Sequence, residues 1–306
     1  MSASIAEKLK NVTDAGNIFL DEDMSRHTSF RVGGRADLFV TPENHREAAD
    51  IVRLLLADKV PYTVIGNGSN LLVSDRGYRG CIVCCRRLED ITVRNDVITA
   101  GAGAILSKVA AKALDNELAG LEFASGIPGS VGGAVVMNAG AYGGEMKDIV
   151  TDVKMLDAGS GEIVTCSCDM MQFGYRTSIV KHHPYIVLEA TMKLTKGVRK
   201  DIKALMDDLA VRRKTKQPLE FPSAGSTFKR PEGYFAGKLI EDADLKGFAV
   251  GGAKVSEKHC GFVINSGNAT ATDIIKLIGI IKDRVREKFG VVLEEEVVIL
   301  GEDASE

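Results

Sequence analysis

Glycine is concentrated in two stretches of this chain, and these stretches restrict its fold more than any other feature of the sequence. The first reads GNGSN at residues 66–70, and the second runs through SGIPGSVGGA at residues 125–134 to NAGAYGG at residues 138–144. Glycine lets the backbone lie against a flat ring or a phosphate where a side chain would collide. Rows of backbone N–H groups in such loops also form concave sites for anions. Two loops of this kind, in successive lobes, predict a large, elongated cofactor.

The first loop taken alone fits either a cofactor contact or a hairpin-like turn. Its G-x-G opens like a dinucleotide-binding fingerprint, but Leu71 stands where the third glycine would be, and a strand-like run follows instead of a helix. The sequence also lacks a Walker A pattern, which argues against ATP as a phosphoryl donor. The loops therefore favour a cofactor held outside these two common nucleotide-binding motifs.

The order of expected elements argues against one doubly wound sheet. Helices are expected at residues 42–58 with Thr41 as cap and Pro42 first, at 104–118, at 198–216, and at 271–288 with Thr270 or Thr272 as cap. Strand-like runs are expected at residues 60–66, 71–74, 79–101, 150–158, 161–166, 184–194 and 291–300. A βα start, a β-rich middle and an α+β tail predict three units at residues 1–87, 88–197 and 198–306.

Charge and apolar patterning favour a cytoplasmic protein without a polyanionic partner. The net charge is -3 and the pI about 6.0, which gives no electrostatic reason to expect nucleic acid or an anionic membrane. The N-terminus lacks the basic and apolar regions of a signal peptide, and no apolar run of about 18 residues predicts membrane insertion.

Six cysteines include a C-x-x-C pair, Cys81 and Cys84. This spacing admits a redox or zinc site, but a strand sends residues three apart to opposite faces. We therefore expect buried free thiols and no metal site.

Five motifs give the chain a specific resemblance to a known family. They are GNGSNLLVSD, residues 126–138 with Gly140 after them, FGYRTS, AGSTFKRP and LEEEV, and they occur in the order found in UDP-N-acetylenolpyruvoylglucosamine reductases, the MurB family. The resemblance extends over nearly the whole chain, from TSFRVGGRADLFV to the last strand. It implies an α+β protein with a two-lobed FAD-binding fold of the vanillyl-alcohol oxidase (PCMH) type and a C-terminal α+β substrate-binding domain.

The resemblance also implies an activity: NADPH-dependent reduction, through FAD, of UDP-N-acetylglucosamine enolpyruvate to UDP-N-acetylmuramate in peptidoglycan synthesis. FAD is held without a covalent bond in the family, and neither glycine loop here contains the His or Cys that related oxidases use for attachment. The cofactor-binding residues that it implies lie in the two loops: Gly66, Asn67, Gly68, Ser69, Asn70, Ser125, Gly126, Pro128, Gly129, Gly132, Gly133, Asn138 and Gly140.

Reduction of an enolpyruvyl ether places hydride on the vinyl terminus and a proton on the neighbouring carbon, through an enolate. By the resemblance, Ser226 is the proton donor, and Arg176 supplies a planar cation for the carboxylate or enolate. Glu296 corresponds to the family's functional carboxylate in LEEEV. Glu294 would share its face on a strand, so the assignment could shift by two residues.

Substrate-binding positions implied by the resemblance are Tyr175, Lys216 and Arg230, of which the two cations suit a diphosphate. Some relatives carry Asn at the position of Arg230. The short third domain resembles the class of the family that lacks an extra tyrosine-bearing loop. Two alternatives stay open: another FAD-dependent oxidoreductase of the same fold, and a non-catalytic UDP-sugar-binding protein. The sequence leaves the oligomeric state and the choice of NADPH or NADH open.

Overall fold

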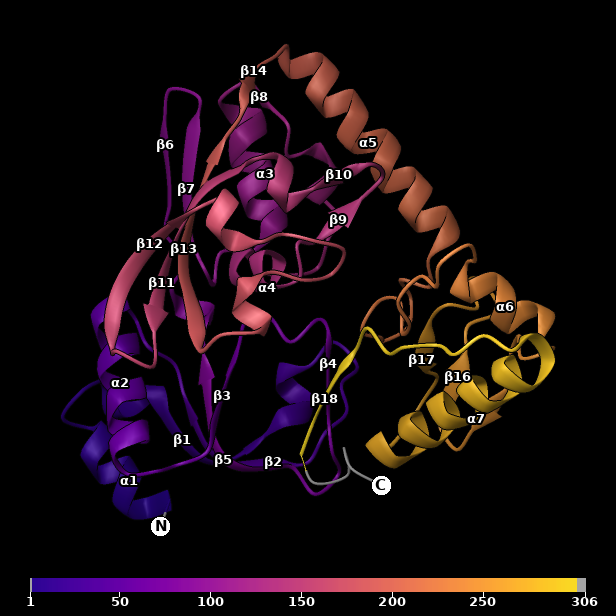
Figure 1. Ribbon diagram of the computed structural model, residues 1–306, viewed down its shortest axis with the longest axis horizontal. Coiled ribbons are helices and arrows are strands. Elements are labelled where there is room, and N and C mark those ends of the chain that lie inside the picture. Colours follow the sequence, from indigo (N-terminus) through magenta and orange to yellow (C-terminus); the bar gives the residue numbers. More distant parts are fainter. Residues whose placement is uncertain (1, 302–306) are drawn as a thin grey trace. The chain divides into compact units, whose positions relative to one another are not determined.

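A computed structural model describes residues 2–301 (Figure 1). The chain divides into two compact units, each assembled from separate stretches. Unit 1 contains the residues up to 20, residues 38–67 and residues 80–213, whereas unit 2 contains residues 21–37, residues 68–79 and the residues from 214 onward. The division into three consecutive domains at residues 1–87, 88–197 and 198–306 stays a prediction.

The described residues form both helices and strands, in a mixed order. The helices are α1 (Ser2–Leu9), α2 (His45–Ala57), α3 (Leu106–Asp115), α4 (Val131–Val136), α5 (Arg199–Lys216), α6 (Ala236–Asp242) and α7 (Ala271–Phe289). The strands are β1 (Ile18–Asp23), β2 (Arg35–Val40), β3 (Tyr62–Ile65), β4 (Leu71–Val73), β5 (Tyr78–Cys84), β6 (Ile91–Arg94), β7 (Val97–Gly101), β8 (Leu118–Ala119), β9 (Gly140–Ala141), β10 (Gly144–Glu145), β11 (Val150–Asp157), β12 (Glu162–Ser167), β13 (Tyr185–Lys193), β14 (Thr195–Lys196), β15 (Ala249–Val250), β16 (Ala253–Val255), β17 (Val263–Asn265) and β18 (Val298–Leu300).

The larger core of unit 1 lies around an antiparallel five-stranded sheet in the order β12-β11-β13-β7-β6. Helices α3 and α4 contribute their apolar faces to this core, and α4 lies next to the central strand β13 (Figure 1). Helix α4 forms inside the glycine-rich passage, where no helix was expected. Backbone bonds from Val131 N to Ala104 O and from Gly132 N to Ala102 O, at 2.9 and 2.8 Å, fix its first turn.

A second core of unit 1 joins α1 and α2 to strands β2 and β5. Strands β3 and β5 pair in parallel, as β-strands joined through a crossover do. Helix α2 begins later than its sequence suggests: Asn44, not Thr41, is its cap, and the Asn44 side chain accepts from Glu47 N at 3.0 Å. The expected start with Pro42 at the first helical position was therefore wrong, because Asn44 offers the better capping side chain.

The core of unit 2 lies between α6, α7 and the antiparallel sheet β15-β16-β17. Helix α7 is capped by Thr270, whose hydroxyl accepts from Asp273 N, while Asp273 accepts from Thr270 N. The prediction of Thr270 is confirmed, and Thr272 instead lies within the helix. Of the strand expected at residues 291–300, only β18 is regular, and it pairs in parallel with β4.

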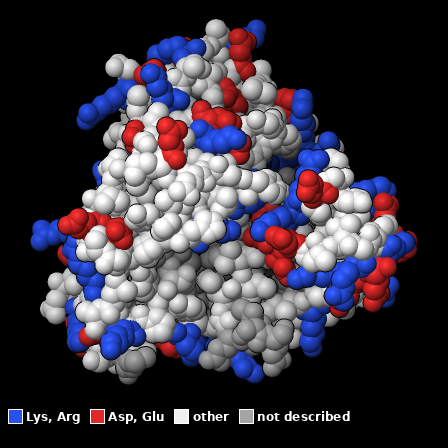
Figure 2. All heavy atoms as spheres, viewed as in Figure 1, with Lys and Arg blue, Asp and Glu red and all other residues white. Residues whose placement is uncertain are grey.

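All six cysteines are free thiols, and Cys81 and Cys84 are both buried on β5. Burial raises the pKa of Cys81 to about 12 and also raises the pKa of Cys84. Among residues 2–301, no helix combines the length and hydropathy needed to cross a bilayer. On the face shown in Figure 2, the described Lys and Arg side chains are interspersed with Asp and Glu.

Candidate active site

An apolar cavity of about 490 Å³ lies within unit 1, and both glycine loops contribute to it. This volume falls in the range of roughly 300–1,000 Å³ typical of small-molecule sites. Its walls come from the end of β3, the start of α4 and the segment leading into β13. They include Tyr62, Val64, Gly66, Gly132, Gly133, Val136, Pro184 and Tyr185.

The two glycine loops approach each other closely at this cavity. A Cβ on Gly66 would lie 2.1 Å from Ser130 Oγ, so any side chain at position 66 would force the Ser130 hydroxyl to move. Ser130 Oγ itself is buried and has no hydrogen-bond partner among the described residues. A buried hydroxyl without a partner is costly, and this one lies beside Gly66, which lines the cavity. The glycines that line the cavity leave room for a flat ring or a phosphate at backbone distance, as a bound dinucleotide such as FAD requires.

Hydrogen bonds hold the second loop in place within unit 1. Asn67 Nδ2 donates to Pro128 O at 2.7 Å, and Leu106 N donates to Gly129 O at 3.1 Å. The Ser125 hydroxyl donates to Glu122 O at 2.8 Å. These side chains and carbonyls position the loop beside the cavity, to whose wall it contributes Gly132 and Gly133.

Asn138 is buried, and other parts of the protein bind both ends of its side-chain amide. Its Nδ2 donates to Glu145 Oε2 at 2.6 Å and to Gly174 O at 3.1 Å, while its Oδ1 accepts from Lys147 N at 2.9 Å. The amide therefore ties the end of the second glycine passage to the turn that carries Arg176.

Arg176 lies in a tight turn closed by a bridge between Gly174 and Thr177. Its φ is 55°, a left-handed conformation that is uncommon outside glycine and concentrates at functional sites. The guanidinium lies 5.2 Å from the ring centre of Tyr175 and donates to Gly140 O at 3.5 Å. The structure thus brings Arg176, Tyr175 and Gly140 together in unit 1.

The remainder of the first loop, residues 68–70, belongs to unit 2. Gly68 has φ 63°, and a Cβ there would lie 1.9 Å from His27 O, while Ser29 N donates to Gly68 O at 3.1 Å. Among the described residues, no acceptor is found for the backbone N–H groups of Gly68 and Ser69. These two donors remain available to an anion.

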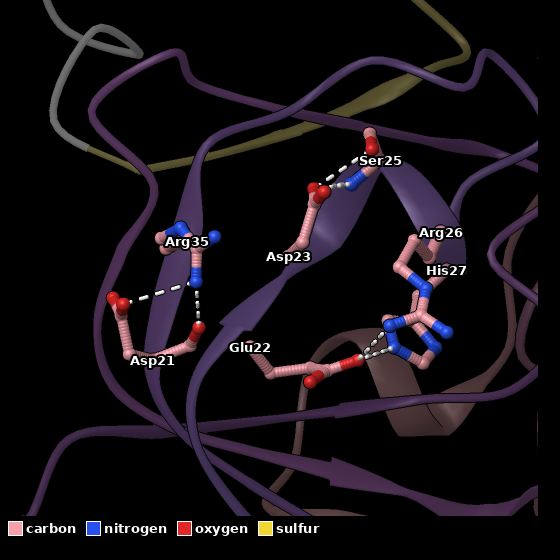
Figure 3. A network of polar contacts seen from close by, with 7 residues as sticks. All are labelled: Asp21, Glu22, Asp23, Ser25, Arg26, His27 and Arg35. Atoms are coloured by element: carbon pink, nitrogen blue, oxygen red, sulfur yellow. Dashed lines mark hydrogen bonds and ion pairs between the residues drawn. The ribbon is translucent and has the colours of Figure 1, made fainter.

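Figure 3 shows the polar network that fixes the segment against which Gly68 packs. Glu22 Oε1 lies 2.7 Å from His27 Nε2, and Asp23 accepts from Ser25 N and Ser25 Oγ at 3.0 and 2.7 Å. The Ser25 hydrogen bonds lower the pKa of Asp23. The network therefore holds residues 23–27 in the short turn whose end contacts the loop.

Ser226 and Glu296 are brought close to each other in unit 2 by backbone pairing. Thr227 O accepts from Glu296 N at 2.8 Å, Lys229 N donates to Glu294 O at 2.9 Å, and Phe228 forms an antiparallel bridge with Glu295. Thr227 is buried, and its hydroxyl accepts from Val263 N at 3.0 Å. Ser226 itself is exposed and follows Gly225, which turns the chain with φ 77°.

The three consecutive glutamates have different surroundings. The Glu294 side chain is 70% exposed and pairs with Lys229 at 2.9 Å, which lowers the pKa of Glu294. Glu295 pairs with Lys282 at 2.7 Å. Asn70 Nδ2 donates to Glu296 O at 2.9 Å, so the first glycine loop holds the backbone at Glu296. Ion pairs with neighbouring lysines thus engage Glu294 and Glu295.

The two expected substrate cations of unit 2 are both exposed. Lys216 is the last residue of α5. Arg230 donates from Nε to Tyr234 O at 3.3 Å, and its guanidinium lies 4.0 Å from the ring centre of Phe235. The sequence reasoning missed Ser130, whose burial within the second loop only the fold reveals. It also missed the cavity residues Tyr62, Pro184 and Tyr185, which only the fold places beside the glycine loops.

Comparison with known proteins agrees with this architecture. A family model for an FAD binding domain matches residues 36–167, and a model for the C-terminal domain of UDP-N-acetylenolpyruvoylglucosamine reductase matches residues 217–300. The structure resembles that of UDP-N-acetylenolpyruvylglucosamine reductase from Thermus caldophilus, with a TM-score of 0.78, 34% identity, and coverage of 93% of this chain and 98% of that chain. A glucose dehydrogenase, Phl p 4.0202, shares only the fold, at 14% identity, TM-score 0.50, and coverage of 64% of this chain and 44% of that chain.

Relatives named UDP-N-acetylenolpyruvoylglucosamine reductase match over almost the full length. The protein from Caldanaerobacter subterraneus subsp. tengcongensis is 52% identical over 302 residues, which cover 99% of this chain and 100% of the relative. The protein from Clostridioides difficile is 52% identical over 296 residues, with coverage of 96% and 97%. The expected α+β fold, with an FAD-binding part and a C-terminal domain of its own, is therefore confirmed, and the chain belongs to the UDP-N-acetylenolpyruvoylglucosamine reductase family.

Proposed function

We propose that this chain reduces UDP-N-acetylglucosamine enolpyruvate to UDP-N-acetylmuramate in peptidoglycan synthesis, with FAD as bound cofactor and NADPH as hydride source. One observation carries the proposal: a chain of this family along its whole length has an apolar cavity lined by both glycine loops. FAD, when bound, supplies hydride transfer. Because UDP-sugars and NADPH are cytoplasmic metabolites, we place the enzyme in the cytoplasm.

The glycine loops are assigned to FAD. Gly66, Gly132 and Gly133 line the cavity and admit a ring or phosphate at backbone distance. The free N–H groups of Gly68 and Ser69 are suited to an anionic part of the cofactor. Four other positions of the loops are held by the hydrogen bonds described above: Asn67, Asn70, Asn138 and Gly140.

The reaction adds a hydride to the vinyl terminus and a proton to the carbon that bears the carboxylate, so a CH2=C unit becomes CH3–CH. We assign the proton to Ser226, whose exposed hydroxyl is accessible to substrate. Arg176 stabilises the negative charge that develops on the carboxylate as the enolate forms. Glu296 is assigned to orient the substrate by its position in the LEEEV motif.

Substrate recognition is assigned to Tyr175, Lys216 and Arg230. Two exposed cations suit the diphosphate of a UDP-sugar. Tyr175 adjoins Arg176 in the same turn and would contact the substrate near the reacting carbons.

The test separates the two half-reactions under anaerobic conditions. The purified protein should show flavin absorption, NADPH should bleach it, and UDP-N-acetylglucosamine enolpyruvate should restore it with formation of a product two hydrogens heavier. Acid precipitation should leave the flavin in the supernatant, since attachment is not covalent. A reduced flavin that this substrate fails to reoxidise would refute the proposal and favour another oxidoreductase of the same fold; a colourless protein would favour a binding protein.

A further inference from the structure

Arg213 is a buried arginine near the end of α5. Only 8% of the residue is exposed. The other buried residues of this helix are Ile202 and Leu209. Leu209 lies seven residues after Ile202 and four residues before Arg213, so all three share one face of the helix. The buried stripe of α5 therefore ends in a cation where an apolar residue would be expected.

Among the described residues, Arg213 has no hydrogen-bond acceptor and no carboxylate partner. Its Nε is fully buried and unpaired. The adjacent Arg212 behaves as a surface arginine: its side chain is 57% exposed and pairs with Asp208 at 2.8 Å. Burial of an unpaired charge is strongly unfavourable, so buried arginines normally have an anionic partner.

The Arg213 guanidinium faces the second glycine passage within unit 1. A Cβ on Gly126 would lie 2.5 Å from Arg213 Nη1, so glycine at this position makes room for the cation. Arg213 Cζ also lies 5.7 Å from the ring centre of Tyr142. Both neighbours belong to the loops assigned to ligand binding.

The features around Arg213 compensate only part of the cost of burying it. The C-terminal end of a helix favours a cation by a factor of about thirty at most in equilibrium constant, and a cation–π contact has a similar upper limit. Neither feature supplies an acceptor for Nε, so the desolvation penalty of that buried donor remains. Nε is buried without an acceptor, whereas the two terminal nitrogens are not fully buried, so they are the donors that a ligand can reach.

We propose that Arg213 binds an oxyanion, a phosphate or a carboxylate, which a ligand brings to the Gly126 and Tyr142 side of the second glycine passage. The inference rests on the proposed function for the identity of the ligand, because FAD and the nucleotide-sugar substrate both carry such groups. Its chemistry is the same for the two sources: planar N–H donors facing anionic oxygens.

The test compares Arg213→Met with Arg212→Met, which removes an exposed cation from the same helix. FAD affinity is measured by titrating apoprotein and following flavin fluorescence, and substrate affinity by the shift of the flavin spectrum in the oxidised holoenzyme. Loss of a charge-assisted bond should raise one dissociation constant roughly tenfold to a hundredfold. A rise for FAD identifies the cofactor as the source, whereas a rise for substrate alone identifies the substrate. Unchanged constants in a folded Arg213→Met protein would overturn the proposal.

A second variant covers the case in which Arg213→Met does not fold. Gly126→Ala keeps the charge but places a methyl group against Nη1, so it should displace the guanidinium and raise the same dissociation constant. In the double variant with Arg213→Lys, the two effects should be less than additive if they act through one contact. Additive effects of the two substitutions, or no effect of Gly126→Ala, would count against the proposal that Arg213 binds an oxyanion of the ligand. The FAD titration needs no turnover, so its result stands even if the proposed substrate proves wrong.

Discussion

Ser226→Ala should separate chemistry from stability. In the structure, the Ser226 side chain is exposed, and among the described residues it forms no hydrogen bond. The position of this residue is held by its neighbour Thr227 through Glu296 N and Val263 N. Removal of the hydroxyl should therefore change the free energy of unfolding by less than about 0.5 kcal/mol.

The same substitution should slow one half-reaction only. NADPH has to reach the flavin but needs no proton from Ser226, so the rate of flavin bleaching should match the wild type. Reoxidation by the enolpyruvyl substrate should slow by roughly 10²–10⁴-fold, the range of general acid catalysis, which corresponds to about 2.7–5.5 kcal/mol of activation free energy.

Stopped-flow absorbance of the flavin measures both rates on one protein. Thr227→Val is the matched control: it leaves Val263 N–H buried without its acceptor and should lower the free energy of unfolding by about 1–3 kcal/mol. Equal slowing of both half-reactions in Ser226→Ala would make Ser226 a structural residue. Unchanged reoxidation would remove it from the mechanism.

Three further predictions follow from the surroundings of particular side chains. Glu296→Gln should keep bound FAD and slow substrate reoxidation by orders of magnitude, while Glu294→Gln should be nearly wild type in the same assay; the reverse would shift the functional carboxylate by two residues. Hydrogen bonds, chiefly from Thr270, lower the pKa of Asp273 from 3.8, so the stabilisation that the ionised carboxylate gives the folded protein should be complete above about pH 4 and lost at lower pH. Asp273→Asn should weaken this dependence of the free energy of unfolding on pH, measured by chemical denaturation. The same dependence in the variant as in the wild type would contradict the prediction. Burial raises the pKa of Cys81 and Cys85 to about 12, so a thiol reagent at pH 8 should label them only after denaturation, and fast labelling of the native protein would argue for a reactive pair.

Local sequence signals predicted those elements whose ends are set by neighbouring residues. Helix α7 begins directly after Thr270, because the Thr270 hydroxyl and the Asp273 carboxylate satisfy each other's backbone donors. The helix ends directly before Gly290, which has a φ of 69°. The strand, glycine loop and strand around residues 66–70 were also predictable, since apolar runs flank them. Asn44 shows the limit of such signals, because Thr41 followed by Pro42 is also a pattern typical of a helix start.

Tertiary contacts decided the rest. Helix α4 has a sequence, VGGAVV, of low helical propensity, and contacts with Ala102 and Ala104 stabilise it. Strand β18 pairs with β4 from the other end of the chain, which periodicity cannot reveal. Likewise, nothing in the sequence of α5 marks Arg213 as buried, because its burial depends on the absence of a side chain at Gly126.

Asn70 connects cofactor binding to catalysis within unit 2. Its motif assigns it to FAD, but its side-chain amide donates to Glu296 O at 2.9 Å and its carbonyl accepts from Val298 N at 3.0 Å. Both bonds set the position of the segment that carries Glu296, and Thr227 O holds the same segment on the Ser226 side. A substitution at Asn70 would therefore move the carboxylate even where FAD binding is unaffected. The glycine loop and the catalytic segment thus form one hydrogen-bonded structure, so a reduced rate in an Asn70 variant identifies a cofactor defect only if FAD affinity falls as well.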